Sequence, residues 1–475
     1  MAASTAHYRV LRPPVTFKPV RIAIASLFIV AAWVLLALQV EPVPTWFYVF
    51  AWYPTLVLLD AVAIRRGERS LFRQPSLIAS VFGWSVAVWL VFEAANLRLE
   101  NWYYVFLPRA PVERWAGIIL SFATVVPAIV LAERVLASLG AGERWRTRPM
   151  PLGLSRADRF VGVGLALLGL TLWRPTWFYP LVWGAVVLIA DPIVYRRRPD
   201  LSLLAGVERG DWRRIGRLLL GGLVIGGLWE TYNYWARGRW VYTVPLLEDL
   251  KWFEMPPLGF VGFPFFALEA WAMYSLLVVW GVAVPLLTDD DGRRQAMMGD
   301  AGQGAARKDE EGRGETVGDE RGRSQAIEGD RRQRRVVVVA AAAAFSVATL
   351  LGMERYTISS TVPSLGIRPA ALEPISSAWQ LARLSADSLA AATGLPADSA
   401  RGLVELARLA TLRGIGTGHA TALARINVRT VCALADRDAE QLWGHLHALN
   451  PELGRRPTPA EVRVWTRAAR RACPL

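Results

Sequence analysis

The chain contains very little cysteine and histidine. Its 475 residues include two cysteines, Cys432 and Cys473, and four histidines. Two cysteines cannot build the disulfide framework of a small secreted domain, and without clustered histidines they do not form a zinc site. We therefore expect no metal site, and no motif in the sequence indicates an organic cofactor.

Charged residues are scarce as well. They make up 20% of a chain that is 53% hydrophobic and contains 21 tryptophans, a composition that soluble domains of this length seldom show. A bilayer core is roughly 30 Å thick, which indicates a membrane protein with eight spans. The apolar runs are 22–40, 46–64, 77–95, 114–132, 160–173, 177–195, 216–234 and 258–287, of which 160–173 is the shortest.

The net charge of +14 would suit a nucleic-acid-binding protein, but the arginines have a simpler explanation. They gather in alternate loops between the apolar runs, which the positive-inside rule places in the cytoplasm. The N-terminus is then cytoplasmic too, and we expect a multi-pass protein of the bacterial inner membrane. The loop arginines are Arg65, Arg66, Arg69, Arg73, Arg144, Arg146, Arg148, Arg156, Arg196, Arg197, Arg198, Arg213, Arg214 and Arg217.

The membrane region contains an internal duplication. The stretch TWFYVFAWYPTLVLLDAVAIRR recurs further on as TWFYPLVWGAVVLIADPIVYRR, so that Asp60 corresponds to Asp191. We expect two four-span units, residues 1–150 and 151–287, related by a pseudo-twofold axis along the membrane normal, as in parallel-repeat transporters. Both aspartates precede an arginine near a span end, which predicts an ion pair or a helix-end contact.

Each unit carries the same polar cluster at the outer end of its third span. VFEAANLRLENWYY in the first unit corresponds to LWETYNYWARGRWVY in the second. A glutamate with an asparagine one turn later presents a carboxylate and an amide on one helix face, which predicts a ligand-binding site. The alternatives are an interfacial aromatic belt and the capping of an outward loop. The residues concerned are Glu93, Asn96, Trp102, Glu230, Asn233 and Trp240.

Glu269 lies deep inside the last apolar run of the second unit. A carboxylate at that depth costs roughly 2.5 to 3.5 kcal/mol or more, which makes it a functional hypothesis by default. We expect Glu269 to be protonated, to line a cavity between the units and to be the catalytic proton donor if the protein is an enzyme. The alternative is a protonated glutamate that pairs with a neighbouring helix. The first unit offers no acidic counterpart, since Glu133 lies beside Arg134 at a span end.

Part of the second unit resembles a known motif. The stretch from WETYNYWARGRWVYTVP through FEMPPLGFVGFPFFALEAWAMY is similar to uncharacterised bacterial multi-pass membrane proteins and covers about fifty residues. A more distant likeness is to membrane carotenoid-modifying proteins of the lycopene cyclase type, which use intramembrane carboxylates on polyene lipids. This likeness implies an apolar lipid ligand, although the acidic motifs of that family do not match this chain residue by residue.

The composition changes sharply after the second unit. Residues 288–335 are rich in charge and glycine and nearly free of large apolar residues, which predicts a disordered polyampholyte linker. The run at 336–353 follows four arginines and is predicted to be a ninth span with those arginines in the cytoplasm. If it crosses the membrane, the C-terminal region is extracytoplasmic. If it lies beside the bundle, that region is cytoplasmic.

Residues 354–475 contain glycine hairpins. LRGIGTGHATALARINVRTVCALADRDAEQL resembles a helix-hairpin-helix domain, and TGLPADSARGLVELA aligns with it as a second copy. The resemblance implies nucleic-acid binding through the turn amides and nearby arginines. Pro396 and Asp398 weaken the second copy, because they remove an amide and repel phosphate, so a protein-interaction module is the alternative. The implied nucleic-acid-binding residues are Arg413, Gly414, Gly416, Gly418 and Arg425.

The sequence thus predicts an all-α protein: a polytopic membrane bundle of two four-helix repeats plus a ninth span, followed by a small soluble helix-hairpin-helix domain. The leading function is the binding of an apolar or amphiphilic small molecule between the repeats, with modification of an isoprenoid or carotenoid lipid as one form of it. The alternative is a membrane anchor that presents its C-terminal module to nucleic acid or to a protein partner.

Overall fold

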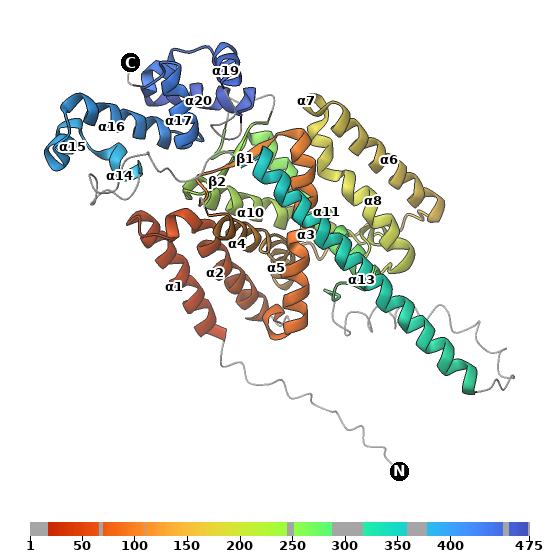
Figure 1. Ribbon diagram of the computed structural model, residues 1–475. Helices are drawn as coiled ribbons and strands as arrows, with labels where there is room; N and C mark the ends of the chain where they lie inside the picture. The colour runs from red at the N-terminus through yellow and green to blue at the C-terminus, as the bar shows by residue number, and fades with distance from the viewer. Residues whose placement is uncertain are drawn as a thin grey trace.

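The computed structural model describes residues 18–65, 70–108, 110–244, 251–286, 317–358, 378–449 and 456–473. A bundle of long helices forms one end of the molecule, and a group of shorter C-terminal helices forms the other (Figure 1). A two-stranded ribbon lies between them, so the bundle and the C-terminal helices meet across it.

The first repeat contains five long helices where four spans were expected. The fourth span is divided because Ser85 accepts a hydrogen bond from the Val126 amide at 3.0 Å and donates one to the Phe122 carbonyl at 2.6 Å. Proline at the first position starts the third and fourth helices. The helices are α1 (Lys18–Ala37), α2 (Val43–Arg65), α3 (Pro75–Leu99), α4 (Pro111–Phe122) and α5 (Val125–Ser138), with a 3-10 turn at Leu71–Arg73.

The second repeat follows the same order with different irregularities. Its second span opens with short turns and is broken inside α8, where Gly184 has φ of +127°. Its elements are α6 (Leu154–Trp173), α7 (Pro175–Phe178), a 3-10 turn at Tyr179–Leu181, α8 (Val182–Arg197), α9 (Leu203–Glu208), α10 (Arg213–Trp235), a 3-10 turn at Pro257–Val261 and α11 (Gly262–Val279).

Asp60 and Asp191 make equivalent contacts in the two repeats. Asp60 accepts hydrogen bonds from Ser70 at 2.6 Å and from the Leu71 amide at 2.8 Å. Asp191 accepts hydrogen bonds from the Ser202 hydroxyl at 2.8 Å and from the amides of Leu203 and Leu204. Each aspartate therefore holds the N-terminal end of the next short helix, and the predicted helix-end contact is confirmed at both positions.

Seven described helical segments are long and apolar enough to cross a membrane, which indicates a multi-pass protein. Two of the nine expected spans, 160–173 and 216–234, fall outside that set. They do form helices, α6 and α10, but charges at the start of α6 and the arginines, glycines and Glu230 of α10 lower their hydropathy.

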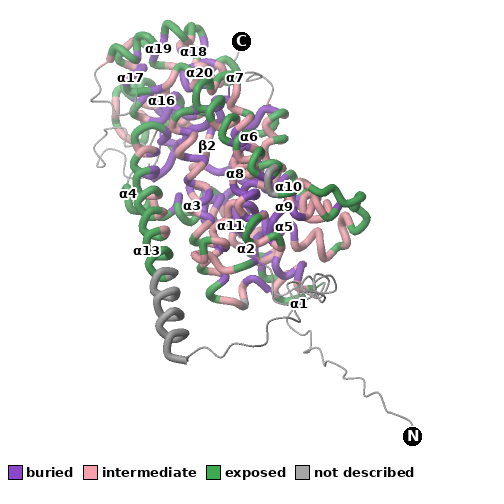
Figure 2. The backbone as a smooth tube through the Cα atoms, turned by 90° about the vertical axis from the view of Figure 1, so that its right-hand side faces the viewer, coloured by how far each residue is buried: buried purple, intermediate pink, exposed green. Residues whose placement is uncertain are grey.

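Helix α13 (Val317–Tyr356) contains the expected ninth span and is much longer than the apolar run. It packs against α3, and its outer face is largely exposed (Figure 2). Apolar side chains such as Val336 and Leu351 lie on that face, as expected beside lipid. The predicted linker is helical from Val317 onward, and its residues 288–316 lie outside the described part of the chain.

The strands β1 (Trp102–Val105) and β2 (Arg239–Tyr242) were not predicted, so the all-α expectation is corrected here. The sequence predicted a ligand-binding cluster at these residues, with an interfacial aromatic belt as an alternative, and no strand. Each segment is only four residues long, too short for an alternating pattern to stand out, and it becomes a strand because the other repeat supplies the pairing partner.

The described residues of the C-terminal region, 378–449 and 456–473, fold into seven short helices around their own apolar clusters. Thr458 and Glu461 form the capping box that the sequence TPAE predicts. Cys432 and Cys473 form a single disulfide, which was not predicted, since two cysteines far apart in sequence carry no signal for pairing. The helices are α14 (Ala378–Arg383), α15 (Ala386–Thr393), α16 (Ala397–Thr411), α17 (Gly416–Arg425), α18 (Val431–Ala435), α19 (Ala439–Ala448) and α20 (Pro459–Ala472).

Candidate functional site

The ribbon joins equivalent parts of the two repeats. Trp102 lies opposite Tyr242, and Tyr104 lies opposite Trp240, in antiparallel pairing. In the duplication, Trp102 corresponds to Trp240 and Tyr104 to Tyr242. Exchanging the repeats therefore gives the same pairs, which is the arrangement that a pseudo-twofold axis through the middle of the ribbon produces.

The ribbon has two faces of different character, because successive side chains of a strand point to opposite sides. One face packs into the membrane bundle and includes Trp102, Tyr104, Trp240 and Tyr242. The other packs against the C-terminal helices and includes Tyr103, Val105 and Val241. The ribbon therefore contacts the membrane bundle with one face and the C-terminal helices with the other.

The two predicted asparagines hold the start of each strand. Asn96 donates to the Trp102 carbonyl at 2.8 Å and accepts from the Asn101 amide at 2.9 Å. Asn233 donates to the Trp240 carbonyl and accepts from the amide of the same residue, both at 2.9 Å. Both amides are buried, and their hydrogen bonds stabilise the turn from helix to strand, as the loop-capping alternative predicts.

The two predicted glutamates each accept a hydrogen bond from a ribbon tyrosine. The hydroxyl of Tyr104 donates to Glu93 Oε1 at 2.5 Å, and that of Tyr242 donates to Glu230 Oε1 at 3.0 Å. Burial is the main cause that raises the pKa of both tyrosines well above the usual value, and the negative charge of the adjacent glutamate is the second cause. Each tyrosine therefore remains a protonated donor, and the carboxyl-tyrosine pair is built twice.

The first copy of this pair is more elaborate than the second. The indole nitrogens of Trp89 and Trp102 also donate to Glu93 Oε1, at 2.8 and 3.1 Å. In the second copy the indole nitrogen of Trp240 has no partner among the described residues. The second carboxyl oxygens of Glu93 and Glu230 likewise have no hydrogen-bond partner there, although both side chains are fully buried.

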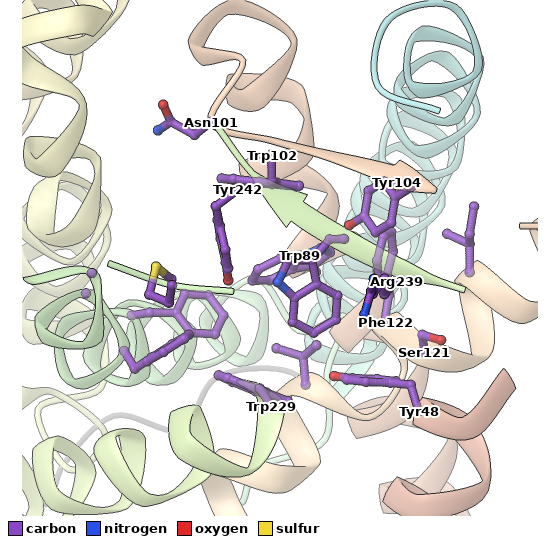
Figure 3. A pocket seen from close by; sticks show the side chains of 18 of the residues that line it. Tyr48, Trp89, Asn101, Trp102, Tyr104, Ser121, Phe122, Trp229, Arg239 and Tyr242 are labelled. Carbon is purple, nitrogen blue, oxygen red and sulfur yellow. The ribbon is translucent and has the colours of Figure 1, made fainter. Parts of the chain in front are cut away.

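A cavity of about 120 Å³ lies beneath the ribbon. Figure 3 shows Trp102, Tyr104 and Tyr242 on the strand side, with Trp229 and Tyr48 facing them. Since a cavity needs roughly 10–15 Å³ to hold one water molecule, this cavity has room for a small organic group. Thirteen of its 25 lining residues are aromatic: Trp46, Tyr48, Trp89, Trp102, Tyr104, Phe122, Tyr179, Trp183, Trp229, Trp240, Tyr242, Phe263 and Phe266.

Glu269 of α11 contacts the backbone of α8. It is fully buried, but it is not among the described residues that line the cavity. Its Oε1 accepts hydrogen bonds from the amides of Gly184 at 2.7 Å and Val186 at 2.9 Å. These amides are left without helical partners by the break in α8, so Glu269 holds the irregular backbone beside the cavity residue Trp183.

A buried ion pair joins the ribbon region to the C-terminal helices. Glu254 is fully buried, and its Oε1 accepts a hydrogen bond from Arg413 Nε at 3.0 Å and forms an ion pair with the same guanidinium group. Arg239 of β2 approaches the same oxygen at 3.9 Å. Lys251 donates to the Tyr242 carbonyl at 3.0 Å. Burial lowers the pKa of Lys251 to about 8, against the opposing influence of Glu254.

The contact between the ribbon region and the C-terminal helices covers some of the residues predicted to bind nucleic acid and leaves the others exposed. Arg413 is directed to Glu254, and Gly414 lies so close to Tyr103 that a Cβ atom would approach its hydroxyl oxygen to 2.4 Å. Gly416 is buried, whereas Gly418 and Arg425 are exposed. The glycine turn therefore faces the ribbon, with only its outer end open to solvent.

Sequence reasoning missed the residues that depend on contacts between distant segments. Tyr104 and Tyr242 stood inside the recognised aromatic clusters, and their similar spacing from Glu93 and Glu230, 11 and 12 residues, was the signal that could have identified them. Glu254 carried no local signal, because its partner Arg413 is far along the chain. Among the described residues, no group of three or more His, Cys, Asp or Glu side chains could hold a metal ion.

Residues 375–472 match a protein family described as "Domain of unknown function (DUF4332)". The match covers the C-terminal helices and leaves the membrane region unassigned. No curated protein and no solved structure matches the chain. The chain is thus similar to this family over its C-terminal domain, and the membrane cavity has to be interpreted from its own geometry.

Proposed function

We propose that this multi-pass protein binds an apolar or amphiphilic small molecule in the cavity beneath the ribbon. The observation that carries the proposal is the aromatic lining, which both repeats contribute. Ligand pockets are typically mostly apolar with a few polar groups that set orientation. Here the polar groups are the two carboxyl-tyrosine pairs, with Glu93 and Glu230 behind the walls.

The position of the cavity favours a ligand that comes from the membrane or its surface. The ribbon follows the ends of α3 and α10, which is where the polar headgroups of a bilayer lie if these helices cross it. A ligand with an apolar chain and a polar end would have both environments within reach. An isoprenoid or carotenoid lipid is one candidate of this kind.

If the protein were an enzyme with Glu269 as its proton donor, Glu269 would have to change its contacts. To donate a proton to a ligand, its carboxyl group would have to approach the cavity and release the amides of Gly184 and Val186. The hydroxyls of Tyr104 and Tyr242 belong to residues that already line the cavity. Binding without chemistry is therefore the simpler form of the proposal.

The test is to fill the cavity and measure what the protein retains. Ser121 lines the cavity, and Ser121→Phe adds a ring to that wall. Ser346 is the matched control, since both serines donate to the carbonyl four residues earlier, at 2.8 and 2.7 Å, and Ser346 lies on α13. The full chain would be purified in mild detergent and its retained small molecules identified by native mass spectrometry.

We expect the parent protein and Ser346→Phe to retain the same small molecule, and Ser121→Phe to lose it at least tenfold. Thermal unfolding of each variant checks that the fold is intact. Equal retention by all three proteins, or no retained molecule in the parent after addition of membrane lipid extract, would overturn the proposal.

A further inference from the structure

The two buried glutamates beneath the ribbon differ in their electrostatic surroundings. Neither forms an ion pair with a described residue. Lys251 is close enough to act on Glu230, but no cationic group of the described chain acts on Glu93. Glu93 is thus a fully buried carboxyl group whose hydrogen-bond partners in the described part of the chain are the neutral donors Trp89, Trp102 and Tyr104.

These three donors form part of the cavity wall. Aromatic rings present negative potential on their faces, so rings that surround a cavity attract cations, and alkylated ammonium groups above all. A carboxylate that accepts hydrogen bonds from the edges of the same rings strengthens this potential. Because Glu93 itself is fully buried, its attraction for a cation is screened less than that of a surface carboxylate.

The cavity wall brings almost no positive charge of its own. Arg239 is the one arginine or lysine among the described lining residues, and its guanidinium group approaches Glu254 at 3.9 Å and donates to the Tyr234 carbonyl at 2.7 Å. Its positive charge therefore lies beside a buried carboxylate of the opposite sign. Most lining residues are aromatic or aliphatic, which favours a cation that has no N–H to satisfy.

We infer that the ligand of this cavity carries an organic cation of the quaternary ammonium class, with Glu93 as its counter-charge. This inference rests on the proposed function and names the ligand class. Trp89, Trp102 and Tyr104 contact the alkyl groups of the cation, and the carboxylate behind them balances its charge. The cation is either a free small molecule or the headgroup of an amphiphile, and both sources share this chemistry.

The test compares a cationic and a neutral ligand of equal chain length, together with a cation that has no chain. The full chain would be placed in nanodiscs of phosphatidylethanolamine and phosphatidylglycerol, which contain no choline, and binding followed by tryptophan fluorescence. The probes are dodecyltrimethylammonium, dodecanol and tetramethylammonium. We expect dodecyltrimethylammonium to bind at least tenfold more tightly than dodecanol. Binding of tetramethylammonium would identify a free cation as sufficient, and its failure beside a tenfold preference would identify an amphiphile.

Variants in the two repeats then locate the counter-charge. Glu93→Gln keeps the size of the side chain and its acceptor oxygen but removes the charge, and it should abolish the preference for dodecyltrimethylammonium. Glu230→Gln is the matched variant at the equivalent position beside Lys251, and it should keep most of the preference. Attraction of cations by the lipid is the same for all proteins, so it cancels in this comparison.

The outcomes separate the inference from the proposed function. Equal affinity of the parent for dodecyltrimethylammonium and dodecanol would overturn the inference and leave the function standing, even if Glu93→Gln does not fold. Binding of neither probe would overturn both. A tenfold preference that survives in a folded Glu93→Gln would overturn the role of Glu93.

Discussion

Single buried side chains hold the irregular parts of this bundle in place. Ser85 forms hydrogen bonds with the backbone between α4 and α5, and Glu269 accepts hydrogen bonds from the backbone at the break in α8. A buried amide without a partner is costly, so one side-chain oxygen at each break is enough to make the irregular backbone stable. Ser85 and Glu269 are thus explained by the backbone groups that they satisfy.

The role of Glu269 predicts a difference between two substitutions. Glu269→Gln keeps an oxygen that accepts from Gly184 and Val186 and should change stability little. Glu269→Ala leaves both amides unsatisfied and should destabilise the protein by about 1 to 3 kcal/mol. The measurement is the midpoint of thermal unfolding in detergent. An equal loss in both variants would show that the carboxyl proton or charge matters more than the acceptor.

Lys251 predicts a dependence of stability on pH. Its pKa falls from 10.5 to about 8 in the folded protein, so between these values the unfolded chain binds more protons and stability rises with pH. Relative to Lys251→Met, the parent should gain about 1 to 3 kcal/mol between pH 7.5 and 10, since one pKa unit corresponds to about 1.36 kcal/mol. Parallel pH profiles of the two proteins would contradict the burial of this ammonium group.

The ribbon is the element on which both halves of the molecule depend. Each strand alone is four residues long, and an isolated two-stranded ribbon is marginally stable at best. It persists here because Asn96 and Asn233 fix its ends, the bundle covers one face and the C-terminal helices cover the other. Loss of either cover should therefore loosen the ribbon.

Arg413 tests this dependence. Arg413→Ala removes the arginine that hydrogen-bonds to Glu254, leaves this buried carboxylate with the more distant Arg239 and Lys251, and should weaken the docking of the C-terminal helices by about 3 kcal/mol. Hydrogen exchange of residues 102–105 and 239–242 should then become faster. Arg425→Ala is the matched control, because this arginine is exposed on the same helical hairpin. Unchanged exchange in Arg413→Ala would mean that the ion pair does not hold the domain.

The same two variants address nucleic-acid binding. We expect little affinity for duplex DNA at physiological salt, because the turn at Gly414 faces the ribbon and Arg413 is paired with Glu254. Binding through this turn would weaken with salt by roughly 0.9 log units per phosphate contacted, for each log unit of salt. Micromolar or tighter binding that Arg413→Ala reduces would prove this expectation wrong.

Across the whole molecule, the arginine-rich and aromatic ends of the bundle are opposite. The end of α13 contacts β1, where the Tyr104 amide donates to the Thr357 carbonyl at 2.8 Å. The start of its apolar run, at Arg335, lies beside Gly281 after α11. The positive-inside rule then predicts that the ribbon and the C-terminal helices lie outside, and a disulfide is typical of proteins in an oxidising compartment.

This topology predicts the results of reporter fusions. A reporter fused after Arg214 should be cytoplasmic, and one fused at Leu475 should be extracytoplasmic. Alkylation of Cys432 and Cys473 in intact cells should require prior reduction. A cytoplasmic signal at Leu475 would mean that α13 does not cross, which is incompatible with a C-terminal domain docked on an extracytoplasmic ribbon.

The sequence by itself determined the features that depend on local composition and period. Long apolar runs predicted a multi-pass helical region, self-similarity predicted equivalent roles for Asp60 and Asp191, and TPAE predicted the capping box at Thr458. The tertiary structure decided the features that need two distant segments. The pairing of β1 with β2, the contact of Arg413 with Glu254 and the placement of Glu269 at the α8 break arise only when the helices pack. A hydrogen bond or ion pair between distant segments leaves no period in the sequence, because its geometry is set by the chain that lies between.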